Sequence, residues 1–100
     1  MAVFLRTELF DGWLRALRDT TGKARIIARI RSAEAGNFGD VAPVGEGIFE
    51  MRIHVGPGYR VYYCRRVGVT YLLLCGGDKS SQRKDISMAK KLLRQLESES

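Results

Sequence analysis

Hydrophobic positions in the first third of the chain recur at the spacing of an α-helix. A short apolar run at residues 3–6 is typical of a strand, and Thr7 after it is a suitable N-cap for a helix. Two apolar stripes follow, each on one helical face: Phe10, Trp13, Leu14 and Leu17, then Ile26, Ile27, Ile30 and Ala33. Thr20 or Thr21 can cap the second helix, and Gly36 ends it. The pattern therefore predicts one strand and two helices in this part of the chain.

From Ile48 the hydrophobic period changes to two. Three segments have the alternation and the aromatic or β-branched content of strands, at residues 48–55, 59–66 and 69–75. Gly56-Pro57-Gly58 joins the first two, and a short turn at Val67-Gly68 joins the last two, which predicts a meander of three strands. Residues 36–47 contain four glycines and one proline, so we expect a loop with at most a short strand there.

The last part of the chain returns to helical spacing. GGDKSS at residues 76–81 breaks the predicted sheet, and apolar residues then mark one helix face up to about residue 97: Ile86, Ala89, Leu93 and Leu96. The resulting order β-α-α-β-β-β-α predicts an α+β fold, in which a small, mainly antiparallel sheet packs with N-terminal helices and a C-terminal helix. A chain of 100 residues predicts a single domain, residues 1–100.

The charge balance narrows the class of partner. The chain has 17 Lys and Arg against 11 Asp and Glu, which gives a formal net charge of +6 and a pI near 9.7. This excess favours an anionic partner such as nucleic acid, a ribosome or an acidic protein. A net charge of about 2 to 8 is also ordinary for the solubility of a small domain.

The sequence shows no sign of a membrane segment. No stretch approaches the roughly 18 to 20 apolar residues that cross a bilayer. Arg6 and Glu8 interrupt the apolar N-terminus, which argues against a signal peptide. We therefore expect a cytoplasmic protein without a membrane partner.

The two cysteines indicate a reducing compartment. Cys64 and Cys75 lie in apolar, strand-like segments, and His54 is the only histidine, so the ligands are too few for structural zinc. We expect two buried thiols and no disulfide. We also expect no metal and no cofactor.

The alternating strands place charged residues together. In residues 48–55, Glu50, Arg52 and His54 fall on one face and the apolar side chains on the other, so we expect the charged face to be the wetter one. If the hairpin pairs in simple register about the Gly-Pro-Gly turn, Arg52 and Arg60 become near-opposite neighbours. Two such cations repel each other and favour an anion between them. The alternatives are that Glu50 neutralises one of them, or that Arg60 is an ordinary solvated strand charge.

Six phrases of the sequence, in order, resemble a known family: WLRALRD, ARIIARI, GNFGD, PVGEGIFEMRI, GPGYRVYY and LLLCGGDKSSQRKDI. Over about residues 3–96 the chain is similar to RelE-like toxins of the RelE/ParE superfamily, which belong to bacterial toxin–antitoxin modules. The nearest branch is the HigB type, called addiction module killer proteins. The resemblance implies the compact fold expected above and an endoribonuclease that cuts messenger RNA without a metal, often in the ribosomal decoding site.

The resemblance also assigns roles to single residues. Arg60 matches the strand arginine that contacts the scissile phosphate, and a guanidinium suits this role because its fork meets two oxygens at once. Arg52 and Lys79 match further basic positions; Lys79 could stabilise the transition state, or cap the loop beside Asp78. Asp85 occupies the position of the tyrosine with which RelE acts on the 2′-hydroxyl.

The proton acceptor is therefore open. His54 lies on the same strand face as Arg52, and an imidazole can act as base or acid near neutral pH, although a lone histidine is more often structural. Glu50 and Asp85 are the other candidate bases. Catalysis by charge stabilisation alone, or weak activity, is a further alternative.

Residues on the second predicted helix and on the strands are candidate RNA contacts. Arg25 and Arg29 are four residues apart and share a helix face. Together with Lys23 they predict a contact with a phosphate backbone or ribosomal RNA. A solvated helix face is the alternative. Aromatic residues could stack on splayed bases or serve only as packing: Phe38, Tyr59, Tyr62 and Tyr63, with Tyr62 as the candidate RNA-binding residue.

The favoured hypothesis is thus the toxin of a type II toxin–antitoxin system, which inhibits translation. The resemblance implies a cognate antitoxin, usually with a helix-turn-helix domain, and contact with operator DNA only through the antitoxin complex. The expected targets are mRNA and the ribosome. The alternative class is a non-catalytic module with the toxin fold that binds RNA, the ribosome or the antitoxin. A DNA-binding repressor is disfavoured, because no helix pair has the short turn and exposed recognition face of a helix-turn-helix.

Overall fold

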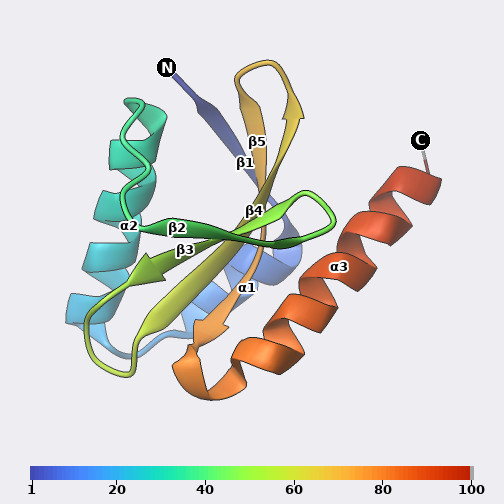
Figure 1. Cartoon of the computed structure of the whole chain (residues 1–100). Helices are drawn as coiled ribbons and strands as arrows, with labels where there is room; N and C mark the ends of the chain where they lie inside the picture. Colours follow the sequence, from blue (N-terminus) through green and yellow to red (C-terminus); the bar gives the residue numbers. More distant parts are fainter. Residues whose placement is uncertain (100) are drawn as a thin grey trace.

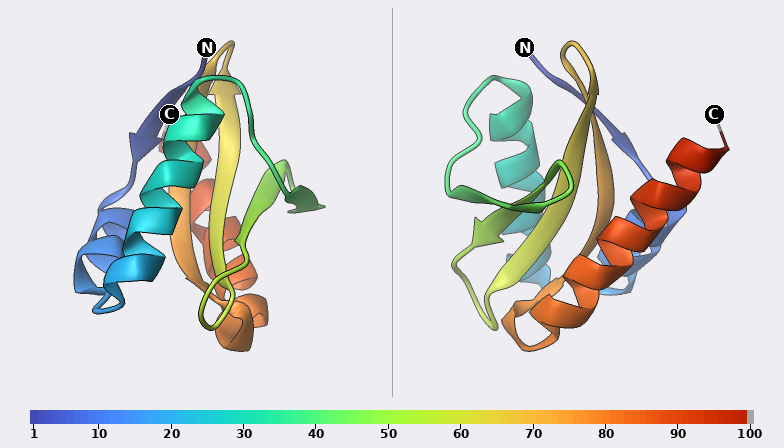
Figure 2. Two further views of the ribbon diagram at one scale, coloured as in Figure 1. Left: turned by 90° about the vertical axis from the view of Figure 1, so that its left-hand side faces the viewer. Right: turned by 45° about the vertical axis from the view of Figure 1, so that its right-hand side comes forward.

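A computed structural model describes residues 1–99 as a five-stranded sheet with helices on both faces (Figure 1). The helices are α1 (Glu8–Ala16), α2 (Thr20–Glu34) and α3 (Gln82–Ser98), and a single 3₁₀ turn, η1 (Lys79–Ser81), precedes α3. The strands are β1 (Val3–Arg6), β2 (Val41–Gly45), β3 (Ile48–Ile53), β4 (Tyr59–Val67) and β5 (Thr70–Asp78). Helices α1 and α2 lie on one side of the sheet and α3 lies on the other (Figure 2).

The sheet is mainly antiparallel. Its strand order is β1-β5-β4-β3-β2, in which β1 runs parallel to β5 and every other neighbouring pair is antiparallel. This confirms the predicted α+β fold with N-terminal helices and a C-terminal helix. The predicted meander corresponds to β3, β4 and β5. Among residues 1–99, no helix is long and apolar enough to cross a membrane.

The glycine-rich segment before β3 contains one short strand, β2, as the sequence allowed. It pairs with β3 through a two-residue turn in which both Glu46 (φ 55°) and Gly47 (φ 80°) have positive φ. Positive φ at both central positions is what a type I′ hairpin turn requires, and glycine meets this requirement without steric cost. The glycines that predicted a loop therefore also build the hairpin that forms the edge of the sheet.

The helices begin where a side chain accepts a backbone N–H group. The Thr7 hydroxyl accepts from the amide of Phe10 at 3.0 Å, as predicted for α1. Helix α2 is capped by Asp19, which accepts from the amide of Gly22 at 3.0 Å, and not by either of the two threonines that follow it. An aspartate is well suited to this position, because its negative charge also meets the positive end of the helix dipole.

Both faces of the sheet are packed. The core under α1 and α2 consists of Phe10, Leu14, Ile26, Ile30, Ala33, Met51, Ile53, Tyr59, Val61, Tyr63 and Leu73. The core under α3 consists of Ile48, Tyr62, Cys64, Leu74, Cys75, Ala89 and Leu93. This second core corrects the expectation of a wet face around Glu50: the side chain is fully buried, because α3 lies over that face of the sheet.

The GGDKSS segment does not break the sheet at Gly76, because β5 continues to Asp78. At Gly76 and Gly77, side chains from the helical layers pack directly against the strand. A Cβ atom on Gly76 would collide with the Trp13 ring of α1, and one on Gly77 would collide with the Asp85 carboxylate of α3. These glycines therefore allow the two helical layers to close onto β5.

The two cysteines are free thiols and both are buried, as expected. Burial raises the pKa of Cys75 to about 12. Since the thiolate is the nucleophilic form, Cys75 is an inert packing residue at physiological pH. Burial also raises the pKa of Cys64, which gives it the same character.

Candidate functional site

The β3–β4 hairpin places the two predicted catalytic arginines side by side. Arg52 is the direct partner of Arg60 in the antiparallel register, as the simple-register hypothesis predicted. The turn between the strands has positive φ at Gly56 (55°) and Gly58 (81°), a conformation that favours glycine. The Gly-Pro-Gly turn thus fixes the register, and the register brings the two guanidinium groups together.

Glu50 is the anion that holds both arginines. Its Oε1 accepts from Arg52 Nε at 3.0 Å and from Arg60 Nη1 at 3.1 Å. Its Oε2 accepts from the Tyr62 hydroxyl at 3.0 Å and from the Gln82 amide at 2.8 Å. Burial alone would raise the pKa of Glu50, but the hydrogen bonds that it accepts and the charge of Arg60 bring it below its ordinary value of 4.5. We call these five residues the arginine–glutamate network.

This network changes two sequence interpretations. Glu50 pairs not with one arginine but with both, and its carboxylate is enclosed and fully engaged, which leaves it poorly placed to act as a base. The two arginines also differ in access: the Arg60 side chain is 12% exposed and the Arg52 side chain is 37% exposed. Arg60 is therefore recessed and held, whereas Arg52 reaches further into solvent.

Tyr62 is a structural member of this network, which contradicts its prediction as an RNA-binding residue. Its side chain is 0% exposed, because α3 covers this face of β4, and a buried ring offers no surface to a base. Burial, together with the bond to Glu50, raises the pKa of Tyr62, so its hydroxyl stays protonated and donates. Tyr59 is also buried, and its hydroxyl donates to Asp19 at 2.8 Å.

A histidine–aspartate pair lies beside Arg52. His54 Nε2 is 2.6 Å from Asp40 Oδ2, and both side chains are well exposed, at 70% and 45%. The hydrogen bond to His54, aided by the nearby charge of Arg52, lowers the pKa of Asp40. Asp40 is held in place because its backbone carbonyl accepts from the Arg52 amide at 3.0 Å. Sequence reasoning missed Asp40, which is fourteen residues from its partner.

Arg29 does not form a common basic surface with Lys23 and Arg25. Its guanidinium points at the β2–β3 region and donates to the backbone carbonyls of Arg52, Phe38 and Asp40. Three carbonyl acceptors hold the guanidinium against the backbone, so the observed role of Arg29 is structural and differs from the predicted RNA contact. The other two members of the predicted cluster separate from it: Lys23 contacts the carbonyl of Arg15 at 3.4 Å, and Arg25 is exposed.

Lys79 lies at the same end of the sheet as the hairpin turn. A Cβ atom on Gly58 would be 3.5 Å from Lys79 Cβ, so the lysine stands directly beside the Gly-Pro-Gly turn. Lys79 is exposed, and the Asp78 carboxylate bonds to Ser80 instead of to Lys79. Asp78 thus caps η1 itself, and both roles of Lys79, to stabilise the transition state or to cap the loop beside Asp78, stay predictions. Asp85 accepts from the Ser81 hydroxyl at 2.6 Å, which places it on the α3 side of β5.

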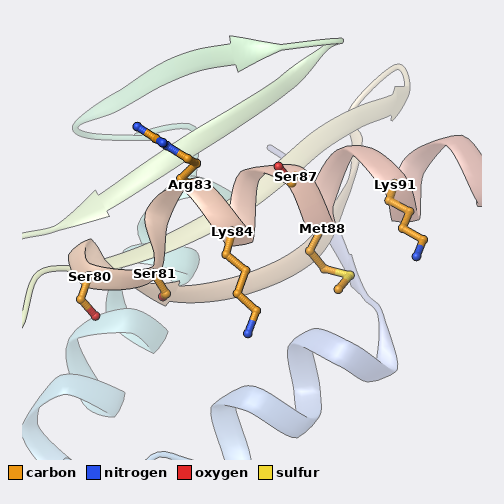
Figure 3. Close-up of a pocket in the computed structure, with 7 residues that line it drawn as sticks. All are labelled: Ser80, Ser81, Arg83, Lys84, Ser87, Met88 and Lys91. Atoms are coloured by element: carbon orange, nitrogen blue, oxygen red, sulfur yellow. The ribbon is translucent and has the colours of Figure 1, made fainter.

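A separate surface hollow of about 740 Å³ runs along the outer side of α3 and does not include the network (Figure 3). The residues that line it are Ser80, Ser81, Arg83, Lys84, Ser87, Met88 and Lys91. Arg83 points away from Lys84, so these cations do not converge on one point (Figure 3). No carboxylate or imidazole lines the hollow.

The fold and the site together define a small basic α+β domain with two strand arginines bound to a buried carboxylate. The chain belongs to the Gp49-like family: residues 12–95 match the family described as "Phage derived protein Gp49-like (DUF891)". The chain is 52% identical over 97 residues to an uncharacterized protein of Haemophilus influenzae strain Rd, which covers 96% of this chain and 98% of that protein.

The Gp49-like family is associated with toxin–antitoxin modules, which supports the predicted link of this chain to such modules. Placement in the RelE/ParE superfamily and in its HigB-type branch stays a prediction. Within residues 1–99, no group of three or more His, Cys, Asp and Glu side chains is arranged to hold a metal ion.

Proposed function

We propose that the protein is the toxin of a type II toxin–antitoxin module and that it cleaves messenger RNA without a metal, in association with the ribosome. The observation that carries the proposal is the pair of strand arginines held on one oxygen of Glu50, with the His54–Asp40 pair beside Arg52. The association of the Gp49-like family with toxin–antitoxin modules supports the toxin role. The net charge of +6 supports a polyanionic substrate.

Glu50 prepares the arginines for a phosphate. A buried carboxylate fixes both guanidinium groups before substrate arrives, so less side-chain entropy is lost on binding. Each arginine gives only one N–H group to Glu50, so further donors of both guanidinium groups can meet the scissile phosphate. In this proposal Arg60 binds that phosphate, while Arg52 and Lys79 stabilise the charge that develops on it.

His54 is the group best placed to accept the 2′-hydroxyl proton, because it is exposed and paired with a carboxylate. Asp40 orients the ring and stabilises the imidazolium that forms. The 2′-oxygen then bonds to phosphorus, the bond from phosphorus to the 5′-oxygen breaks, and the leaving oxygen takes a proton from solvent. The products are a 2′,3′-cyclic phosphate and a free 5′-hydroxyl. In this proposal neither Glu50 nor Asp85 acts as the base.

A cognate antitoxin completes the proposal. The family association with toxin–antitoxin modules supports such a protein partner. We propose that the antitoxin carries a helix-turn-helix domain and that the toxin reaches operator DNA only through the complex. The antitoxin would also explain how a cell tolerates the toxin.

Expression of the chain without its antitoxin tests this function. We expect growth to stop and transcripts to be cut, with 2′,3′-cyclic phosphate ends. Arg60→Ala should relieve the arrest and lower the cleavage rate by about 10² to 10³, the usual effect of removing one transition-state donor. Arg66→Ala is the matched control, since Arg66 is an exposed arginine on the same strand, beyond the network. Normal growth with folded wild-type protein would disprove the toxin proposal.

A second candidate function is a non-catalytic module that binds RNA, the ribosome or the antitoxin. One observation favours it: the charges of Arg52 and Arg60 are balanced by Glu50 and by Asp40, whose Oδ1 is 3.9 Å from Arg52 Nη1. A site that is neutral overall attracts a phosphate less strongly than two free cations would. Growth arrest with intact transcripts would select this function over cleavage.

A further inference from the structure

The face of the sheet opposite the arginine–glutamate network carries an aromatic hollow. Its volume is about 260 Å³, and it lies where the segment between α2 and β2 meets the sheet. The residues that line it are Phe38, Val41, Phe49, Tyr63, Arg65 and Tyr71. Pockets for drug-sized ligands usually hold about 300 to 1,000 Å³, so this hollow has room for a single planar ring group and little more.

Two tyrosines, Tyr63 and Tyr71, line this hollow, and Tyr63 is the more deeply buried of the two. The Tyr63 side chain is 97% buried, with 3% exposed, and no hydrogen-bond partner of its hydroxyl is found among residues 1–99. No enclosed side-chain oxygen or nitrogen of the described residues lacks a partner, so this hydroxyl keeps some accessible surface, and Tyr63 lines the hollow. Burial, followed by the proximity of Tyr71, raises the pKa of Tyr63 to about 12, so the hydroxyl is a proton donor at neutral pH.

The rings around this hydroxyl suit a flat aromatic guest. Phe49 is stacked on Tyr63 with ring centroids 5.7 Å apart, and Phe38 is tilted against Tyr71 at 5.2 Å. Phe38, Phe49 and Tyr71 are only partly buried, so their rings remain in part accessible. Accessible aromatic side chains bind unpaired bases by stacking, and the binding free energy gained for each base depends little on which base it is.

The charge at the rim favours a nucleotide over a neutral ring. Arg65 lines the hollow, and its observed hydrogen bond runs from Nε to the carbonyl of Gly68, which leaves the terminal amino groups for an anion. No acidic side chain lines the hollow. Aromatic rings, tyrosine hydroxyls and one cation match a base and the phosphate next to it.

We propose that this hollow binds one unpaired base of a single-stranded RNA, with Arg65 on an adjacent phosphate. Only the choice of RNA as the bound polymer rests on the proposed function. The two sites are close along the chain: Phe38 lines the hollow, and Asp40, two residues later, bonds His54. Two extended residues span at most about 7 Å, so Phe38 and Asp40 are close in space, and in this proposal one RNA strand passes around the β2 edge of the sheet to reach both sites.

Binding of a fluorescein-labelled 2′-O-methyl RNA ten-mer, followed by anisotropy, tests the inference. This probe lacks the free 2′-hydroxyl, so binding is measured without cleavage. Tyr63→Phe removes only the hydroxyl, and we expect it to weaken binding by about 2- to 10-fold, the net contribution of one hydrogen bond. Arg65→Ala should weaken binding and lower the slope of log affinity against log salt by about one. Tyr59→Phe and Arg66→Ala are the matched controls.

Each result decides one proposal. Equal affinities for wild type, Tyr63→Phe and Arg65→Ala would overturn the base-binding inference, even if the wild type cuts RNA. Conversely, intact transcripts in arrested cells would count against cleavage while leaving the anisotropy result to stand. If Tyr63→Phe keeps its RNA affinity but loses affinity for the purified antitoxin, the hollow is a protein-docking site and the RNA inference is wrong.

Discussion

The β3–β4 hairpin and helix α2 both carry closely spaced arginines, but the groups that these arginines bind are different. Arg52 and Arg60 converge on a carboxylate that is fully buried, so their positions are fixed from within. On α2, Arg29 turns inward to backbone carbonyls, while Arg25 stays exposed. The difference teaches that a buried counter-charge, more than the spacing of cations along a chain, fixes the positions of neighbouring arginine side chains.

Glu50→Gln should have the largest effect, because it removes the charge on which the hairpin site depends. Breaking a buried ion pair at one partner leaves the other uncompensated, and we expect the free energy of unfolding to fall by about 3 to 5 kcal/mol. Urea denaturation measures this loss. Glu46→Gln is the control: Glu46 pairs with Arg94 on the surface, where such pairs contribute little. Equal stability of the two variants would mean that Glu50 is not the anchor of the site.

The effect of Glu50→Gln should shrink in acid. The hydrogen bonds to Glu50 lower its folded-state pKa, so the carboxylate contributes stability that is present above its ordinary value of 4.5 and is lost as pH falls through the lower folded value. The wild type therefore loses this contribution in acid, whereas the glutamine variant has none to lose. Denaturation at several pH values between about 6 and 3 checks this, and a constant difference between the two proteins would refute it.

Arg29→Ala should have an intermediate effect, since it releases three backbone carbonyls from one charged donor. We expect a loss of about 1 to 3 kcal/mol in the free energy of unfolding. A local readout is hydrogen exchange of the Arg52 amide, which bonds to the Asp40 carbonyl and should exchange faster in the variant. Arg29→Lys keeps the charge but lacks the guanidinium fork, so it should restore stability only in part. Unchanged exchange would show that Arg29 does not hold this segment.

The hairpin part of the site was predictable because its determinants are local. Alternation and a glycine-based turn set the register, and the register alone places Arg52 opposite Arg60. The buried state of Glu50 had a weaker signal: the consecutive apolar residues of Tyr62-Tyr63-Cys64 indicate a strand that is covered on both faces. Alternation within β3 concealed this, because a charged residue on a covered face looks the same in sequence as one on a wet face.

The remaining contacts were not predictable from pattern, because they join segments far apart along the chain. Gln82 reaches Glu50 across thirty-two residues, and nothing near Gln82 marks it as a partner. Asp40 reaches His54 only because β2 pairs with β3, a pairing that the glycine-rich segment left open. The inward turn of Arg29 likewise depends on the path of the chain after α2, which helical spacing does not determine.

Arg25→Ala should have the smallest effect and completes the comparison with the hairpin. Arg25 is an exposed residue of α2, so we expect the free energy of unfolding to stay within about 0.5 kcal/mol of wild type. If Arg25 contacts a phosphate, binding of the 2′-O-methyl ten-mer should weaken by a similar factor for every base sequence, and the salt slope should fall by about one. Arg31→Ala, at another exposed position of α2, controls for the loss of one charge. Equal affinities for Arg25→Ala, Arg31→Ala and wild type would assign Arg25 to the solvated face of the helix and leave the hairpin as the main phosphate contact.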